Sequence, residues 1–295
     1  MKIHLSRFDN IVVFGSGTIA GSCVEFLRKQ TSGRIFVFEK KDHSISTLEK
    51  YISAMQDTYY RAIEDEIEET VLQIKPKIIF SIGSSYIFRK PLVDVCPIIN
   101  YHNALLPRHP GRNAEAWAIF SQDRETGVTW HWVERTVDTG DVIMQRAIPL
   151  TTSITSIKLL SLQAKLAFDM FQEIAEKILE GQELPSQRQK YMGSIQYHYS
   201  WDRPNGGILD AAWDFRTISA FLRAMDYGRL FLLGKPALMA DGVGYTWKKY
   251  SFKPPKGDTG IVLNWQNNLC TISKREGSIE LQGLERMQSE AELEV

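Results

Sequence analysis

The sequence has few cysteines, no net charge and no long apolar run, and each of these absences excludes a class of protein. Only three of its 295 residues are cysteine (Cys23, Cys96 and Cys270), and none has CxxC spacing, which excludes a disulfide framework and a cysteine-based zinc site. Lysine plus arginine and aspartate plus glutamate both number 35, which argues against a broadly basic nucleic-acid-binding surface but not against a local patch. No apolar run approaches the roughly 18 residues of a membrane span and no signal peptide is evident, so we expect a reduced, cytoplasmic setting without a membrane partner.

The first half of the chain alternates apolar strands with helices. Hydrophobic residues make up 43% and charged residues 24% of the chain, as in ordinary globular proteins, and the length indicates about two domains. Strands followed by helices predict βαβ units, and therefore a Rossmann-like α/β fold with a mainly parallel sheet. The expected strands cover residues 10–14, 34–39, 77–82, 98–101 and 127–133, and the expected helices cover 19–30, 48–55, 63–74, 114–121 and 156–180.

The pattern changes after residue 181. Residues 182–196 are polar and aperiodic, which predicts a linker, and a short helix is expected over 217–226. Short strands then follow, separated by turns at 234–236, 241–242, 254–257 and 267–268, a spacing typical of a small β-barrel or sandwich. We therefore expect two domains, residues 1–190 and residues 191–295.

A glycine-rich turn, Gly15 to Gly21, follows the first strand, and Glu39 ends the second. This order approaches the dinucleotide-binding fingerprint, but the spacing is GxGxxxG rather than GxGxxG. A tight strand-to-helix turn is the favoured interpretation, and binding of NAD or of a phosphate group are the alternatives.

Polar residues cluster after the strand over 98–101. Asn100 and His102 are two residues apart on an extended chain, so their side chains share one face. Asp138 opens an acidic turn, residues 138–141, after a later strand. An amide donor for an oxyanion, a histidine that moves protons and a carboxylate that orients it form a plausible acyl-transfer set. No metal site is expected, because the histidines show no HxH or HxxxH spacing.

Together, these motifs resemble the folate-dependent formyltransferases, which act on methionyl-tRNA, glycinamide ribonucleotide or amino sugars. The resemblance rests on Asn-x-His at 100–102, LLP at 105–107, Gly111, ETGVT at 125–129 and DTGD at 138–141. A weaker match at 207–210, Trp213 and 234–236 resembles the start of that family's C-terminal OB-like β-barrel domain. The resemblance implies a formyltransferase catalytic domain over 1–190 and a β-barrel-like domain over 191–295. It also implies that N10-formyltetrahydrofolate donates a formyl group to a primary amine, with no metal and no NAD.

The resemblance also assigns residues. Asn100 and protonated His102 are expected to stabilise the tetrahedral oxyanion, while Asp138 holds His102 and helps to accept the amine proton. The folate is expected at two loops, formed by Ser84, Ser85, Tyr86, Ile87 and Phe88 and by Thr139, Gly140 and Asp141. Candidate contacts to the acceptor are Arg108, Arg112, Trp130 and Trp132.

The identity of the amine is less constrained. From residue 190 onward there are 13 Lys plus Arg and 12 Asp plus Glu, a net charge of only +1, and this makes tRNA an unfavourable partner. We expect a small-molecule acceptor, either a nucleotide-linked amino sugar or an amino acid of a natural-product pathway. The alternatives are a methionyl-tRNA formyltransferase, a formyltetrahydrofolate hydrolase and a catalytically silent NAD-binding or scaffold protein. No sequence feature predicts the oligomeric state.

The expected boundary predicts where a protease cuts first. Because polar, aperiodic connections are the preferred sites of nicking, limited proteolysis should begin between about residues 181 and 204. Mass spectrometry of the earliest fragments checks this. Early cuts within the first 150 or so residues would contradict the boundary.

Overall fold

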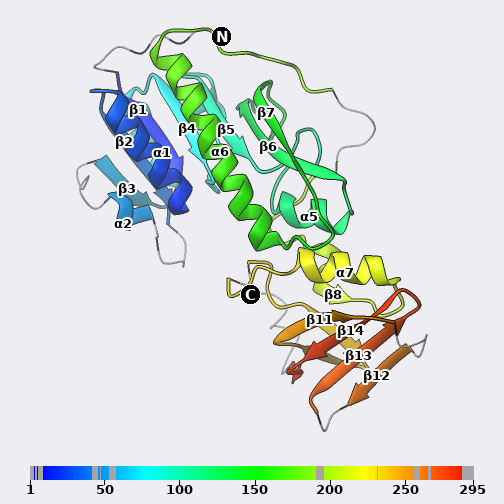
Figure 1. Cartoon of the computed structure of the whole chain (residues 1–295). Coiled ribbons are helices and arrows are strands. Elements are labelled where there is room, and N and C mark those ends of the chain that lie inside the picture. Colours follow the sequence, from blue (N-terminus) through cyan, green and yellow to red (C-terminus); the bar gives the residue numbers. More distant parts are fainter. Residues whose placement is uncertain are drawn as a thin grey trace. The chain divides into compact units, whose positions relative to one another are not determined.

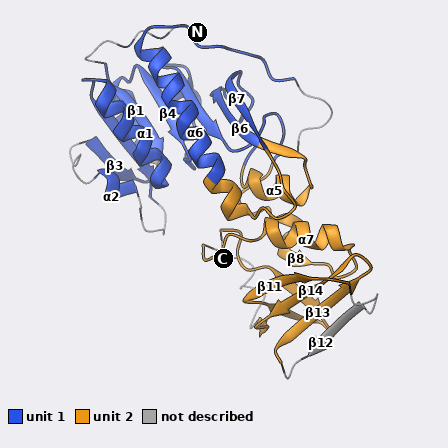
Figure 2. Cartoon of the chain, in the orientation of Figure 1, with its two compact units in different colours: residues 1–111, 127–148, 162–197 blue, residues 112–126, 149–161, 198–295 orange. Residues whose placement is uncertain are grey.

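The chain folds into two compact units, shown in different colours in Figure 2. The computed structural model describes residues 3, 5, 9–41, 46, 48–52, 58–190, 196–230, 232–255, 260–264 and 267–287. Unit 1 comprises residues 1–111, 127–148 and 162–197, and unit 2 comprises residues 112–126, 149–161 and 198–295. Unit 2 thus also takes in two segments of the first 190 residues. The expected domain boundary near residue 190 stays a prediction.

Unit 1 contains a seven-stranded sheet in the order β3-β2-β1-β4-β5-β6-β7 (Figure 1). The pairs β3-β2, β2-β1, β1-β4 and β4-β5 are parallel, and β6 is antiparallel to β5. The predicted mainly parallel α/β sheet is therefore confirmed. The strands are β1 (Ile11–Gly15), β2 (Ile35–Lys40), β3 (Tyr59–Ala62), β4 (Ile78–Ile82), β5 (Ile98–His102), β6 (Glu125–Trp132) and β7 (Val142–Pro149).

Helices cover both faces of this sheet, because its inner strands are apolar on both faces. On β1, Val13 belongs to a core cluster with α1 and the second half of α6, whereas Val12 and Phe14 belong to a cluster with α3 and α4. Alternate residues of one strand thus bury opposite faces. The helices are α1 (Gly17–Gln30), α2 (Leu48–Ile52), α3 (Glu64–Ile74), α4 (Lys90–Val93) and α6 (Ser156–Leu179), of which α6 begins in unit 2.

Two strands were absent from the sequence prediction. All four residues of β3 are only half-buried, and in β7 only Ile143 is fully buried. Neither segment contains the run of buried apolar residues that predicted the other strands. Within the described ranges, no helix is long and apolar enough to span a membrane.

The glycine-rich turn is explained by packing and backbone conformation. A Cβ on Gly15 would lie 2.5 Å from the Cβ of Ala20, and one on Gly21 would lie 2.8 Å from the side chain of Tyr51. Gly17 has φ +69°, a left-handed conformation that favours glycine. All three glycines therefore have a structural reason, as the tight-turn interpretation requires.

Glu39, the acidic residue of the same pattern, is buried and already bonded within the protein. One oxygen of its carboxylate, Oε2, accepts hydrogen bonds from the hydroxyl of Ser46 and, at 2.5 Å, from that of Tyr59. Those hydroxyls supply the partners that a buried carboxylate requires.

Unit 2 is rich in β-structure, as predicted. It contains two four-stranded sheets, β15-β10-β9-β8 and β11-β14-β13-β12, together with α5 (Ala114–Phe120), a 3₁₀ turn η2 (Pro204–Gly207) and α7 (Phe215–Ala224). In the β13-β14 pair, Cys270 lies opposite Leu281 and Ile272 opposite Ile279, and all four are buried. The strands are β8 (Ile208–Leu209), β9 (Ala237–Ala240), β10 (Val243–Thr246), β11 (Lys249–Lys253), β12 (Gly260–Asn264), β13 (Leu269–Lys274), β14 (Gly277–Gln282) and β15 (Glu285–Arg286).

Candidate active site

Strands β5 and β6 place three polar side chains side by side. Asn100 pairs with His131, and His102 pairs with Thr129, across this antiparallel pair. Directly opposite residues point to the same face of a sheet, so Asn100, His102 and His131 share one face. His102 and His131 are buried, 4% and 1% exposed, and this polar group is therefore largely shielded from water.

Asp138 joins this group from the segment that follows β6. Its Oδ2 lies 3.4 Å from Nδ1 of His102, and its Oδ1 lies 3.4 Å from Nε2 of His131. The backbone N–H of Gly111 donates to the same Oδ2 at 2.8 Å. One carboxylate thus faces both histidines and accepts a backbone hydrogen bond.

The path of the chain that brings Asp138 to His102 differs from the one expected from the sequence, which placed Asp138 at the end of a strand. Because β6 is antiparallel to β5, the end of β6 lies beside the start of β5, where the N–H of Val133 donates to the carbonyl of Ile98. The chain must therefore turn back after β6 to bring Asp138 to His102. Asp138 itself has φ +57°, which is uncommon for a residue other than glycine.

The environment sets the ionisation of Asp138 and His102. Burial by itself raises the pKa of the Asp138 carboxyl, but His102, His131 and the Gly111 N–H outweigh burial, and the pKa lies well below its usual value. Burial lowers the pKa of His102, and the charge of Asp138 only partly opposes this. At neutral pH, Asp138 is therefore ionised, and the resting His102 is mainly neutral.

Both ring nitrogens of His102 face acceptors. Its Nε2 lies 2.9 Å from the carbonyl oxygen of His109, and its Nδ1 faces Asp138. Only the doubly protonated ring donates to both oxygens. Burial thus disfavours the charged ring, although acceptors are in place for both of its N–H groups. A group that gains a proton during a reaction needs this combination.

His131 was absent from the predicted site. Its Nδ1 lies 2.8 Å from the carbonyl oxygen of Trp132, which only accepts, so Nδ1 carries the proton. Its Nε2 lies 3.0 Å from Nδ2 of Asn100 and 3.4 Å from Oδ1 of Asp138, so the neutral ring accepts from Asn100 and the protonated ring donates to Asp138. The sequence held a signal, because polar Thr129 and His131 alternate with apolar residues along the strand.

The turn that carries Asp138 is held by the segment after α6. Nε2 of Gln189, a buried side chain, donates to the carbonyls of Asp138 and Gly140, both at 2.8 Å. Ser186 donates to the carboxylate of Asp141 at 2.7 Å. Gly140 has to be glycine, because a Cβ there would lie 1.8 Å from the carbonyl oxygen of Trp132.

The same segment corrects the linker prediction. Backbone hydrogen bonds in both directions join Gln187 to Val142, the first residue of β7. Composition indicated a linker because the residues are polar and aperiodic, but their described part pairs with the sheet. Residues 191–195 of the expected linker lie outside the described residues.

The predicted folate loops flank the polar group. Residues 84–88 follow β4, whose Ser81 pairs with Asn100, and parallel strands bring their carboxyl ends to one edge of the sheet. Within this loop, the rings of Tyr86 and Phe88 pack on Phe14 at 4.8 and 4.9 Å, in the core. The two rings therefore anchor this loop in the core, and its contact with folate stays a prediction. Ser85 and Ile87 are exposed, and Ser84 is half-buried.

On the second loop, Thr139 and Asp141 are half-buried, and Gly140 is buried. Their contact with folate stays a prediction.

Two predicted acceptor contacts lie in the core instead. Trp130 is fully buried, packs on Phe171 at 5.6 Å and donates from Nε1 to the carbonyl of Ala167 at 3.2 Å. Trp132 shares that face of β6, and its Nε1 donates to the carbonyl of Pro185. Both indoles lie on the face opposite His131, so the prediction that they line an acceptor pocket is wrong.

Arg108 and Arg112 follow β5 and are exposed. Arg108 belongs to unit 1 and Arg112 to unit 2, where its backbone N–H donates to the carbonyl of His198 at 2.8 Å. Their contact with the acceptor stays a prediction. Among the described residues, no group of three or more His, Cys, Asp or Glu is placed to hold a metal ion.

A family model described as formyl transferase matches residues 9–168, more than half of the chain and all of the polar group described above. The chain belongs to the formyl transferase family. It is 32% identical over 127 residues to GDP-perosamine N-formyltransferase of Brucella melitensis, covering 43% of this chain and 47% of that protein. It is 29% identical over 186 residues to methionyl-tRNA formyltransferase of Pelobacter propionicus, covering 60% and 57%. The chain thus spans about half the length of these curated relatives.

A solved formyltransferase has the same fold. The structure of an N-formyltransferase from Helicobacter canadensis, in complex with folinic acid and dTDP-3-aminofucose, superposes with a TM-score of 0.72. The match covers 95% of this chain and 100% of that one at 17% identity. The similarity therefore extends through both units and confirms the predicted fold class.

The buried His102 predicts a loss of stability on acidification. Because folding lowers the pKa of His102, its contribution is complete above the ordinary value of 6.5 and is lost as the pH falls below it. The free energy of unfolding should therefore decrease from about pH 7 to 5, and less so in His102→Gln. Urea denaturation measures this. The same slope in His102→Gln as in the wild type would contradict the prediction, and His109→Gln is the matched control.

Gln189 should act as a positioning residue for Asp138. Gln189→Leu leaves two buried carbonyls without their donor, a change that typically costs about 1–3 kcal/mol of stability. A freed Asp138 turn should also shift the pH at which the His102 ring titrates, which NMR measures and which a purely structural loss would not move. Gln187→Ala removes an exposed glutamine side chain from the same segment and should change neither value. An unchanged His102 titration in Gln189→Leu would refute the role.

Proposed function

We propose that this protein transfers a formyl group from N10-formyltetrahydrofolate to a primary amine of a small metabolite, with a nucleotide-linked amino sugar as the favoured acceptor. The observation that carries the proposal is the group formed by Asn100, the buried His102 and Asp138 in a chain of the formyl transferase family. A neutral donor, a histidine and an ionised carboxylate supply what acyl transfer to an amine requires.

The reaction forms a bond between the amine nitrogen and the formyl carbon and breaks the bond between that carbon and N10 of the folate. One amine proton ends on N10. The two loops predicted for the folate flank Asn100, one following the paired strand β4 and the other carrying Asp138. The proposal puts the formyl group between these loops, next to the amide of Asn100.

Asn100 stabilises the developing negative charge. His131 holds one N–H of the Asn100 amide, so the second N–H is the donor for the oxyanion. A donor fixed before the reaction needs no reorganisation when the charge appears, and this is the main source of its effect.

His102 handles the proton. Its Nδ1 stays on Asp138, and a reacting group takes the place of the His109 carbonyl at Nε2. The ionised Asp138 then stabilises the imidazolium, which burial otherwise disfavours. In this scheme, Asp138 acts through His102 and needs no direct contact with the amine.

The choice of acceptor rests on similarity and on charge. The Brucella relative is named for a nucleotide-linked amino sugar, and the Helicobacter structure contains one together with a folate. Methionyl-tRNA formyltransferases are also relatives. The residues from 190 onward have a net charge of only +1, which disfavours a partner with many phosphates. An amino acid acceptor and a cytoplasmic setting stay predictions.

Asn100→Ala should lower kcat with little loss of folate binding, because the hydrogen bond strengthens as the oxyanion forms. Loss of one such donor typically costs about 100- to 1,000-fold. His102→Ala should be at least as severe, and Asp138→Asn should keep the fold but lose activity. Variants that combine these substitutions should lose no more turnover than the most severe single variant, because the three residues act as a unit. Near-normal turnover in either the Asn100 or the His102 variant would refute the assignment.

A turnover screen tests the acceptor. Formyl-folate consumption is measured with nucleotide-linked amino sugars, free amino acids, carrier-bound aminoacyl groups and methionyl-tRNA. An amino sugar should support turnover that changes little between low and moderate salt, because it makes few phosphate contacts. Efficient formylation of methionyl-tRNA with a steep salt dependence would reverse the ranking. Folate consumption without any amine would identify a hydrolase.

A further inference from the structure

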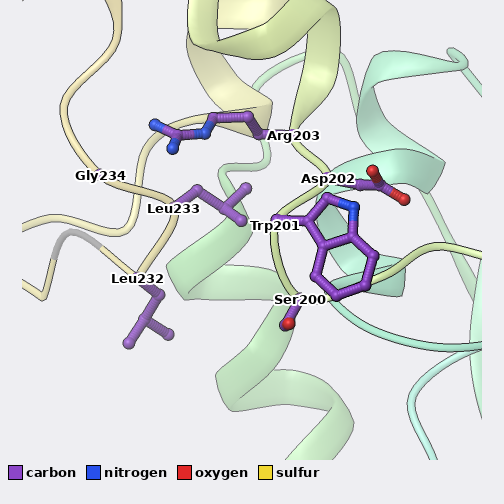
Figure 3. A pocket seen from close by; sticks show the side chains of 7 residues that line it. All are labelled: Ser200, Trp201, Asp202, Arg203, Leu232, Leu233 and Gly234. Carbon is purple, nitrogen blue, oxygen red and sulfur yellow. The ribbon is translucent and has the colours of Figure 1, made fainter. Parts of the chain in front are cut away.

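Unit 2 contains a hollow that the active site does not use. It has a volume of about 340 Å³ and lies between residues 200–203 and residues 232–234 (Figure 3). This volume is in the range of small-molecule sites, which usually combine apolar surface with a few polar groups. The lining residues are Ser200, Trp201, Asp202, Arg203, Leu232, Leu233 and Gly234.

An exposed aromatic pair lies at this hollow. The rings of Tyr199 and Trp201 stack with centroids 5.0 Å apart and planes within 3°, although 54% of Tyr199 and 71% of Trp201 are exposed. Asp202 fixes the turn that presents them, because its Oδ2 accepts from the N–H of Tyr199 at 2.7 Å and its own N–H donates to the Tyr199 carbonyl at 3.1 Å. The pair is therefore a preformed stacking surface.

Arg203 adds an unsatisfied charged donor. Its Nη1 is buried and has no hydrogen-bond partner among the described residues. The Arg203 side chain lies over Gly207. A Cβ at position 207 would lie 3.0 Å from Cδ of Arg203, so the glycine leaves room for the arginine side chain. Nη1 itself is shielded against Gly207, but Arg203 also lines the hollow, so the rest of its guanidinium is the donor available to an anionic ligand.

We propose that this hollow binds a nucleoside diphosphate, with the base stacked on Trp201 and a phosphate oxygen on Arg203. Figure 3 shows the indole ring to the right of Leu233 and the Arg203 side chain above it, so the two groups are spaced apart, as a ligand with a base at one end and an anion at the other requires. Base–aromatic stacking and charge-assisted hydrogen bonds to phosphate are the two interactions that these side chains offer. An anion alone would leave the aromatic pair uncovered, and an apolar ligand would leave the charge of Arg203 unused.

The site goes beyond the proposed formyl transfer, because the ligand binds here without a folate and without turnover. The nucleoside diphosphate has two possible sources. It is either the nucleotide part of the acceptor or a free nucleotide that acts as an effector.

Isothermal titration calorimetry of the full chain with UDP, GDP and dTDP tests the proposal. At least one of the three should bind, and Trp201→Ala and Arg203→Ala should each weaken it about tenfold or more. Trp201→Phe and Arg203→Lys should retain more of the affinity, because a ring and a charge remain. Arg275→Ala removes an exposed arginine elsewhere in unit 2 and should have no effect. Circular dichroism of each variant checks the fold.

Inorganic pyrophosphate and the matching nucleoside, titrated separately, should each bind more weakly than the diphosphate. Kinetics then separate the two sources. A raised KM for the amino sugar at unchanged kcat in Trp201→Ala identifies the acceptor's nucleotide. An unchanged KM with loss of a nucleotide effect on turnover identifies an effector.

The proposal is refuted if none of the three nucleotides binds the wild type, or if Trp201→Ala and Arg203→Ala bind as tightly as Arg275→Ala. A chain that binds the nucleotide through Trp201 but transfers no formyl group would refute the proposed function and leave this site standing. The two proposals therefore fail separately.

Discussion

The carboxylate of Asp138 is the group on which the active-site geometry depends. One oxygen faces His102 and accepts from the Gly111 N–H, and the other faces His131. An ionised carboxylate at a buried position is stable only with such partners, since burial otherwise favours its neutral form. The partners in turn gain their orientation from it. The three side chains and the backbone of Gly111 thus form one electrostatic unit, in which a change at one member alters the others.

Because Asp138 lies in a left-handed conformation on a turn after an antiparallel strand, this unit needs support from outside β5 and β6. That support comes from Gln189, which bonds the carbonyls of Asp138 and Gly140, and from the backbone pairing of Gln187 with Val142. The segment after α6 therefore connects the end of the α/β chain to the turn that carries Asp138. Gly140 completes the turn, since only a residue without Cβ fits against the Trp132 carbonyl.

The two units differ in the kinds of side chain that they present to a ligand. In unit 1, a group of buried and half-buried polar side chains lies at the carboxyl edge of the parallel strands, where α/β folds usually bind their ligands. In unit 2, the hollow at Trp201 and Arg203 combines an exposed stacked pair with the charge of an arginine. The first arrangement suits a group that changes charge during a reaction. The second suits recognition of a ligand that keeps its charge.

The sequence by itself determined the α/β architecture, because the inner strands are apolar on both faces and show as short runs between helices. It also identified Asn100 and His102, because a two-residue spacing on a strand places both on one face. It did not determine which face of β6 is covered, and so it assigned Trp130 and Trp132 to a pocket and missed His131 between them. Period-two alternation separates two faces, but only the packing of α6 decides which one is buried. The burial of the Tyr86 and Phe88 rings on Phe14 was hidden from the sequence for the same reason. Gln189 and the return of the chain to Asp138 depend on contacts between residues 27 to 51 positions apart, which no local pattern encodes.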